Sequence, residues 1–312
     1  MTSSATLSKP VLSRGDRVFS RSAFFAGGMI LVTLAAVALF LILQSIPAFF
    51  ATSETASILP GNFWAYVWPL IFGTVWAALL SLLIALPLSI GIALFISHYA
   101  PRRLSAVLGY IVDLLAAVPS VVFGLWGIGV LAPAAQPVFV WLNTYLGWIP
   151  FLGGTVSGTG RTILTAAVVL AVMILPIMTA ICREVFLQAP VLHEEAALAL
   201  GATRWEMIRL AVLPFGRPGI VSAAMLGLGR ALGETMAVAM VLSATGLVSL
   251  RLLTSENPST IAANIALSFP EAYGTNVNVL IATGLILFIV TFLVNAIARW
   301  IVSRRAQFNG AD

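Results

Sequence analysis

The segment HEEAALALGATRWEMIRLAVLPFGRP, residues 193–218, separates two long apolar stretches and is the most informative part of the chain. Two glutamates open an alanine- and leucine-rich run, and carboxylates stabilise the positive N-terminal end of a helix dipole. Gly201 interrupts this run, and a second amphipathic piece over 203–213 is expected to end at Pro214. The pattern predicts two short helices joined at a glycine, either lying on a membrane surface or presented to a soluble partner.

Apolar residues dominate the chain on both sides of this segment. Hydrophobic residues make up 60% of the 312 residues and charged residues only 9%, and the mean hydropathy is +1.05. Soluble domains carry about 25% charged residues, so this composition excludes soluble and disordered proteins. The apolar runs are continuous rather than alternating, which indicates an all-α integral membrane protein and not an outer-membrane barrel.

Six apolar stretches are long enough to cross a hydrocarbon layer of about 30 Å as helices. Most of the 16 lysines and arginines fall in the segments on one side of these spans, so the positive-inside rule predicts that both termini are cytoplasmic. The predicted spans are 23–46, 69–97, 110–132, 162–182, 219–242 and 278–298. The predicted organisation is a cytoplasmic tail 1–22, a membrane domain 23–303 with a cytoplasmic loop 191–214, and a tail 304–312.

The rarest residue types exclude several chemistries. Cys182 is the single cysteine, and the two histidines are far apart in sequence, so neither a disulfide nor a histidine metal site is expected. Lys9 is the only lysine and lies in the polar tail, so the chain has no Walker A loop. We therefore expect no enzyme activity and no bound cofactor here. The net charge of +5 reflects topology rather than nucleic-acid binding.

Prolines interrupt three of the predicted spans, at Pro87, Pro119 and Pro176. Each removes a backbone donor and is expected to kink its helix. Such breaks serve either helix packing or the lining of a transport pathway, and the sequence leaves both open.

Two long connections lie on the side opposite the positive charges, at 134–160 and 246–277. In the first, Trp141, Tyr145 and Trp148 predict a short helix at headgroup depth. The glycine-rich remainder of that connection is interpreted as a linker, with a ligand-binding loop as the alternative.

The segment 193–218 resembles the EAA loop of bacterial ABC importer permeases. Leu200 and Ala211 depart from the usual family residues, but the glycine bend and the final proline are present. The resemblance implies a type I permease: six transmembrane helices with an L-shaped cytoplasmic coupling helix pair that docks on an ATPase. The residues that carry it, and that would couple to the ATPase, are Glu195, Ala196, Ala197, Gly201, Leu213 and Pro214.

Two further segments resemble the phosphate (Pst) importer permeases: DLLAAVPSVVFGLWG, residues 113–127, and GLGRALGETMAV, residues 227–238. The second is more similar to PstC-type subunits than to PstA-type subunits. The resemblance implies half of a transmembrane heterodimer in the bacterial inner membrane. Its partners would be a PstA-type permease, a PstB-type ATPase dimer that uses ATP and magnesium, and a PstS-type external phosphate-binding protein. The alternatives are a sulfate or molybdate ABC permease and, from another class, a secondary ion-coupled carrier.

Arg230 and Glu234 lie inside a predicted span, four residues apart and so expected on one helix face. An arginine at the bilayer centre costs about 2.5–3.5 kcal/mol on insertion scales, so such residues are usually functional. The pair is either a structural ion pair or part of the substrate pathway. The family resemblance favours the pathway, with Arg230 as the phosphate contact and Glu234 neutralising and orienting Arg230 when no substrate is bound. Asp113 is expected either to line the pathway or to pair with a cytoplasmic arginine, namely Arg102, Arg103 or Arg204.

Overall fold

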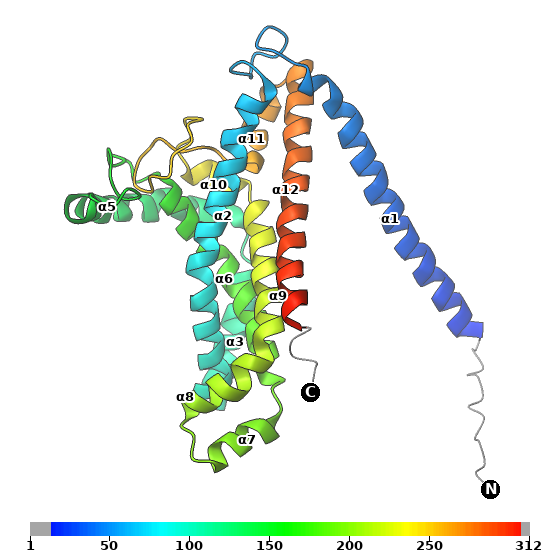
Figure 1. Cartoon of the computed structure of the whole chain (residues 1–312), viewed down its shortest axis with the longest axis vertical. Helices are drawn as coiled ribbons and strands as arrows, with labels where there is room; N and C mark the ends of the chain where they lie inside the picture. Colours follow the sequence, from blue (N-terminus) through cyan, green and yellow to red (C-terminus); the bar gives the residue numbers. More distant parts are fainter. Residues whose placement is uncertain (1–13, 307–312) are drawn as a thin grey trace.

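The computed structural model describes residues 14–306, and the described chain folds into helices joined by turns and by longer irregular connections (Figure 1). Residues 1–13, with Lys9, and residues 307–312 lie outside the described part. The α-helices are α1 Arg14–Phe49, α2 Phe63–Leu94, α3 Arg102–Ala116, α4 Ser120–Trp126, α5 Ala132–Leu146, α6 Ile163–Leu187, α7 Val191–Ala199, α8 Arg204–Met207, α9 Leu213–Leu232, α10 Met236–Val241, α11 Ile261–Ser268 and α12 Thr275–Ala306. Three π-helical turns, η1 Phe95–Tyr99, η2 Gly127–Leu131 and η3 Ile208–Val212, and a 3₁₀ turn, η4 Phe269–Glu271, complete the order.

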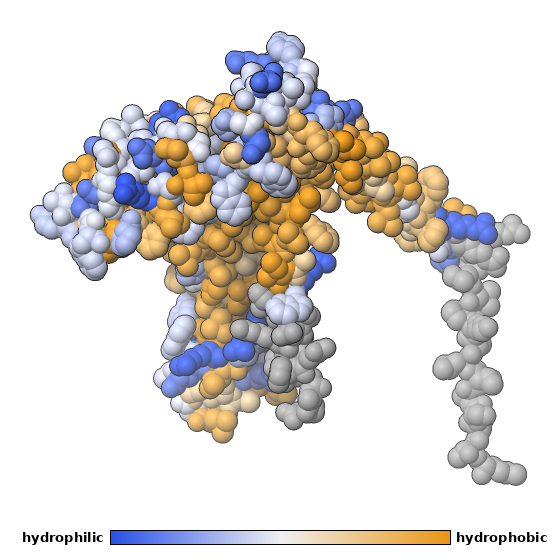
Figure 2. All heavy atoms as spheres, turned by 45° about the horizontal axis from the view of Figure 1, so that its top comes forward, coloured by the Kyte–Doolittle hydropathy of each residue, from blue (hydrophilic) through white to orange (hydrophobic). Residues whose placement is uncertain are grey.

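Six helices in the described part are long and apolar enough to cross a membrane, as predicted. Figure 2 shows apolar surface along α1 and around the middle of the bundle, with hydrophilic residues gathered at the loops beyond it. The N-terminal end of α1, the C-terminal end of α12 and the pair α7–α8 all lie toward the same end of the molecule (Figure 1). The six segments are Val18–Phe49, Phe63–Tyr99, Ser120–Leu146, Ile163–Leu187, Arg204–Leu232 and Thr275–Trp300.

The central helix of the bundle is α6, which packs against both α2 and α9. Its side chains Leu170, Met173, Ile174 and Met178 are buried. Gly227 allows α9 to approach closely, because a Cβ at this position would lie 2.7 Å from the sulfur of Met178. Small residues at helix contacts are typical of membrane bundles, where lipid tails are as apolar as leucine and close packing supplies the association.

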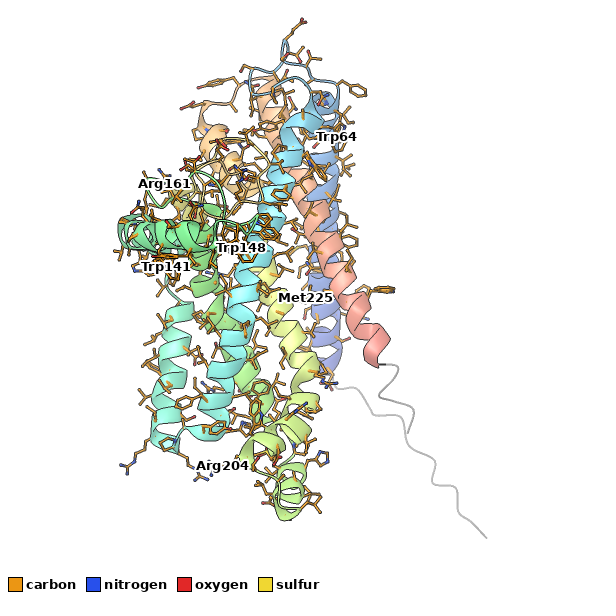
Figure 3. The ribbon with its side chains drawn as sticks, turned by 60° about the vertical axis from the view of Figure 1, so that its left-hand side comes forward. Trp64, Trp141, Trp148, Arg161, Arg204 and Met225 are labelled. Atoms are coloured by element: carbon orange, nitrogen blue, oxygen red, sulfur yellow. The ribbon has the colours of Figure 1, made fainter. Side chains whose placement is uncertain are left out.

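The third predicted span, 110–132, is wrong in its position. Helix α3 ends at Ala116, and α4 begins at Ser120 with Pro119 in an extended conformation before it. The residue that precedes a proline is disfavoured in the helical region, so the helix stops there. The next apolar segment runs to Leu146, and its last part, α5, lies across the long axis of the bundle (Figures 1 and 3).

The other two prolines do not interrupt their helices. Pro87 lies within α2 and Pro176 within α6, and both helices continue past them. Of the three prolines expected to interrupt a helix, only Pro119 does so. Neighbouring helices in a membrane bundle can satisfy the carbonyl that a proline leaves without a donor.

The fifth predicted span, 219–242, is two helices rather than one. Helix α9 ends at Leu232, with Gly233 as its C-cap, and α10 begins at Met236. On the other side, Pro214 does not end the preceding helical piece as predicted, because it lies in the first turn of α9 directly after the π-helical turn η3. A proline lacks only a backbone donor, and the altered hydrogen-bond register of a π-helical turn accommodates that lack.

Candidate functional site

Arg230 is half-buried near the C-terminal end of α9 and opens onto a groove of about 670 Å³ between α6, α9 and α12. Its Nε atom is buried and has no hydrogen-bond partner among the described residues. Met225, another lining residue, lies at mid-height of the bundle in Figure 3. The other lining residues are Ile177, Ser222, Leu226, Gly229, Asn295 and Arg299. A guanidinium with unused donors in an apolar bundle is a strong site for an oxyanion, because electrostatic interactions are less screened there.

Glu234 does not lie on the same helix as Arg230, which corrects the sequence-based expectation. Since α9 ends at Leu232, Glu234 falls in the break before α10 and is 9% exposed. Its Oε1 atom accepts a hydrogen bond of 3.1 Å from the backbone N–H of Ala237, in the first turn of α10. Within residues 14–306, no ion pair joins it to Arg230. The carboxylate instead stabilises the N-terminal end of a helix, where free N–H groups need acceptors.

Arg161 holds the other end of α10, and sequence reasoning did not identify it. Its Nη2 atom donates to the carbonyl of Met240 over 3.0 Å, near the last turn of α10. A cation at a helix C-terminus and a carboxylate at its N-terminus both complement the helix dipole. The six-residue helix α10 is thus held by a charged side chain at each end. The residues are 73 positions apart, so only the fold brings them to one helix.

The two long outer connections are joined to each other. The backbone N–H of Leu252 donates to the carbonyl of Phe151 over 2.8 Å, and that of Ser157 donates to the carbonyl of Leu253 over 2.9 Å. The buried side chain of Asn257 donates to the carbonyl of Thr254 and accepts from the first N–H of α6. The glycine-rich segment, interpreted from sequence as a linker, is thus hydrogen-bonded to the second connection. Figure 3 shows the labelled residues Trp141, Trp148 and Arg161 close to α5, away from the end of the molecule at which Arg204 lies.

Asp113 is exposed on α3. No ion pair joins it to Arg102, Arg103 or Arg204 in the part of the chain that the structure describes, so the expected pairing is not formed. The arginine that α3 does contact is Arg183 of α6, whose guanidinium covers Gly109 so closely that a Cβ there would overlap it. The sequence analysis did not indicate that Arg183 would take this place.

The predicted coupling segment forms the L-shaped helix pair α7–α8 at the lower end of Figure 1. Gly201 joins the helices with a φ of +87°, a conformation that other residues adopt only with strain. Thr203 and Glu206 then form a capping box at the start of α8, a T-x-x-E signal that the sequence analysis did not use. Of the predicted coupling residues, Glu195, Ala196 and Gly201 are exposed and Ala197, Leu213 and Pro214 are half-buried.

An apolar surface lies beside these coupling residues. Leu192 is 73% exposed and Leu200 is 90% exposed. A groove of about 470 Å³ separates α7 from the start of α9. A side-chain contact ties the pair to the bundle, since Nε2 of His98 lies 3.5 Å from Oε1 of Glu194. Exposed apolar residues on a short helix pair are typical of a surface that another protein covers.

The fold offers a cationic groove inside an apolar bundle and an exposed helix pair with apolar side chains at one end of it. These features define the class as a transport permease. The chain belongs to the family of binding-protein-dependent transport system inner membrane components, whose model matches residues 85–307. It is a multi-pass membrane protein.

Similar proteins agree with this assignment. The chain is 45% identical to the phosphate transport system permease protein PstC 2 of Mycobacterium tuberculosis, over 94% of each chain. It is 43% identical to PstC of Mycobacterium leprae, over 97% of this chain and 98% of the relative. Two solved ABC transporters share the fold. One is an alginate importer, with a TM-score of 0.58, 19% identity and coverage of 92% and 99%. The other is the inward-facing MetNI methionine transporter, with a TM-score of 0.52, 18% identity and coverage of 76% and 96%.

Proposed function

We propose that this chain is the PstC-type permease subunit of an ATP-driven phosphate importer. The observation that carries the proposal is Arg230, an arginine inside the bundle whose guanidinium opens on a groove and has no carboxylate partner among the described residues. Phosphate is rich in hydrogen-bond acceptors, and the planar fork of arginine matches two of its oxygens. The 45% identity to a phosphate transport permease supports phosphate as the substrate.

The proposed assembly contains three further kinds of protein subunit. A PstA-type permease supplies the second half of the pathway, and a PstS-type external protein delivers phosphate. A PstB-type ATPase dimer binds ATP and magnesium, and its surface docks on the helix pair α7–α8. This chain itself holds no cofactor and performs no covalent chemistry. ATP binding closes the ATPase dimer and moves the two permeases as rigid bodies, which exposes Arg230 to each side of the membrane in turn.

Two features of the chain suit it to this movement. The contact between His98 and Glu194 connects η1, the π-helical turn that follows α2, to α7, so a displacement of the helix pair is transmitted into the bundle. The charged contacts at both ends of α10 keep this short helix in place beside the break at Gly233. Rigid elements joined at a few hinges are the usual structural basis of alternating access.

The experiment that tests the proposal is uptake of radiolabelled phosphate into proteoliposomes that contain the complete complex. We expect uptake only with the external binding protein present and with ATP on the ATPase side. Excess sulfate or molybdate should not compete, and an ionophore that collapses ion gradients should have no effect. Uptake that survives ATP removal but stops with the ionophore would contradict the proposal and support a secondary carrier.

The proposed orientation places both termini and the pair α7–α8 in the cytoplasm. In a Cys182→Ser background, a cysteine at Trp148, which is 79% exposed, should react with a membrane-impermeant thiol reagent in intact cells. A cysteine at Leu200, which is 90% exposed, should react only after lysis. The reverse pattern of labelling would show that the orientation is wrong.

A further inference from the structure

The groove that contains Arg230 carries a second cation at its other end. Arg299 of α12 lines the same groove, and Asn295 lies one helical turn before it on the same face of α12. Ser222 adds a hydroxyl from α9. None of the described lining residues is acidic. The polar atoms of Arg230, Arg299, Asn295 and Ser222 therefore offer mainly hydrogen-bond donors, set among isoleucine, leucine and methionine side chains.

The direction of the groove follows from the two helices that form it. Helix α9 rises from the coupling end, so Ser222 is about 14 Å and Arg230 about 26 Å along its axis from Leu213. Helix α12 runs the opposite way and ends near the coupling side (Figure 1). Arg299 is close to that end, whereas Arg230 lies deeper in the bundle. The groove thus leads from the deep arginine toward the side on which α7 and α8 lie.

Electrostatics argues that the groove is built for an anion. Two guanidinium groups on one groove repel each other, and no lining carboxylate compensates them. A purely structural role for an arginine inside a bundle would be served by pairing it with a carboxylate. A competing explanation is that Arg299 only marks the cytoplasmic end of its span, as arginines often do. That explanation does not require Asn295 and Ser222 to line the same groove, and it is tested below.

We propose that Arg299, together with Asn295 and Ser222, forms a second binding station for a phosphate group, between Arg230 and the cytoplasmic mouth. This inference rests on the proposed function, because it places the station on the exit route of the substrate. A transported ion must bind well enough to enter but must also leave, and several weaker sites in series achieve this better than one tight site. The same donor chemistry also fits the phosphate of an anionic lipid headgroup, so the experiment separates the two sources.

The test measures binding of radiolabelled inorganic phosphate to the complete complex in nanodiscs of phosphatidylcholine, without nucleotide or external binding protein. The Arg230→Gln background isolates the station. In this background we expect residual phosphate binding that Arg299→Gln weakens about 10-fold, the effect of one lost charge-assisted hydrogen bond. Arg299→Lys should weaken it less, because an ammonium keeps the charge but not the fork. The matched control is Arg217→Gln, an exposed arginine at the coupling end of α9 outside the groove, which should leave binding unchanged.

A second arm uses nanodiscs that contain phosphatidylglycerol and measures how much of this lipid remains with the purified complex. If Arg299→Gln reduces the retained lipid but not phosphate binding, the station takes a lipid headgroup. If the variant alters neither, or if Arg217→Gln alters both equally, the proposal is overturned. Failure of the proposed function gives a different result. In that case the unmodified complex transports no phosphate with ATP, whatever Arg299→Gln does to binding.

Discussion

Replacing Arg230 by glutamine is expected to reduce ATP-driven phosphate uptake about 100-fold while the complex still assembles. Glutamine keeps much of the length and a donor group but loses the charge and the planar fork, and each charge-assisted hydrogen bond contributes about 1.5–3 kcal/mol. Assembly should survive because Arg230 has no ion-pair partner among the described residues that its removal would leave uncompensated. Uptake, ATPase activity and subunit co-purification measure the three effects separately. Arg230→Lys should restore only part of the uptake.

The double variant Arg230→Gln with Glu234→Gln distinguishes a substrate contact from a structural pair. If the two residues stabilised each other, neutralising both would restore transport. The structure predicts no rescue, because Glu234 interacts with the backbone of Ala237 and not with Arg230. Glu234→Gln alone should assemble normally, since an amide oxygen also accepts that hydrogen bond. A double variant that transports at the normal rate would exclude Arg230 as the phosphate contact.

Replacing Gly201 by leucine is expected to reduce ATPase co-purification and ATP-driven uptake by at least about 10-fold. At φ +87° a leucine is strained, which costs about 1–3 kcal/mol, and the helix pair relieves the strain by changing its bend. Crowding plays no part, because a Cβ at Gly201 would meet no atom within 4 Å. The protein should still insert, since the change lies outside the apolar core of every span. Gly201→Asn should retain most docking, because asparagine tolerates this conformation.

A matched control separates the bend from general backbone strain. Gly274 also has a positive φ, of +57°, and open space around its Cβ position, but it lies at the start of α12, far along the bundle from α7. Gly274→Leu should introduce similar strain without affecting ATPase co-purification. If Gly201→Leu leaves both co-purification and uptake unchanged, the coupling assignment of α7 and α8 is wrong.

The limits of sequence reasoning are clearest at two places in the chain. The helical path is broken before Pro119 and at Gly233, whereas it continues through Pro87 and Pro176. Local propensity is similar at all the prolines, so the outcome depends on which neighbouring helix satisfies the freed backbone groups. A run of apolar residues indicates that a segment is buried in lipid or protein, but it does not show where the helix breaks.

Composition, the six apolar runs and the glycine between two amphipathic pieces were sufficient to determine the fold class, the number of spans and the short helix pair α7–α8. These features depend on local physics: lipid demands internally bonded helices, and a positive φ favours glycine. Tertiary structure alone decided the partners of the charged residues. It separated Glu234 from Arg230, brought Arg161 to the end of α10, and placed Arg299 in the groove with Arg230. Each of these arrangements depends on how distant helices pack, and electrostatic contacts across such distances leave no periodic signal in the sequence.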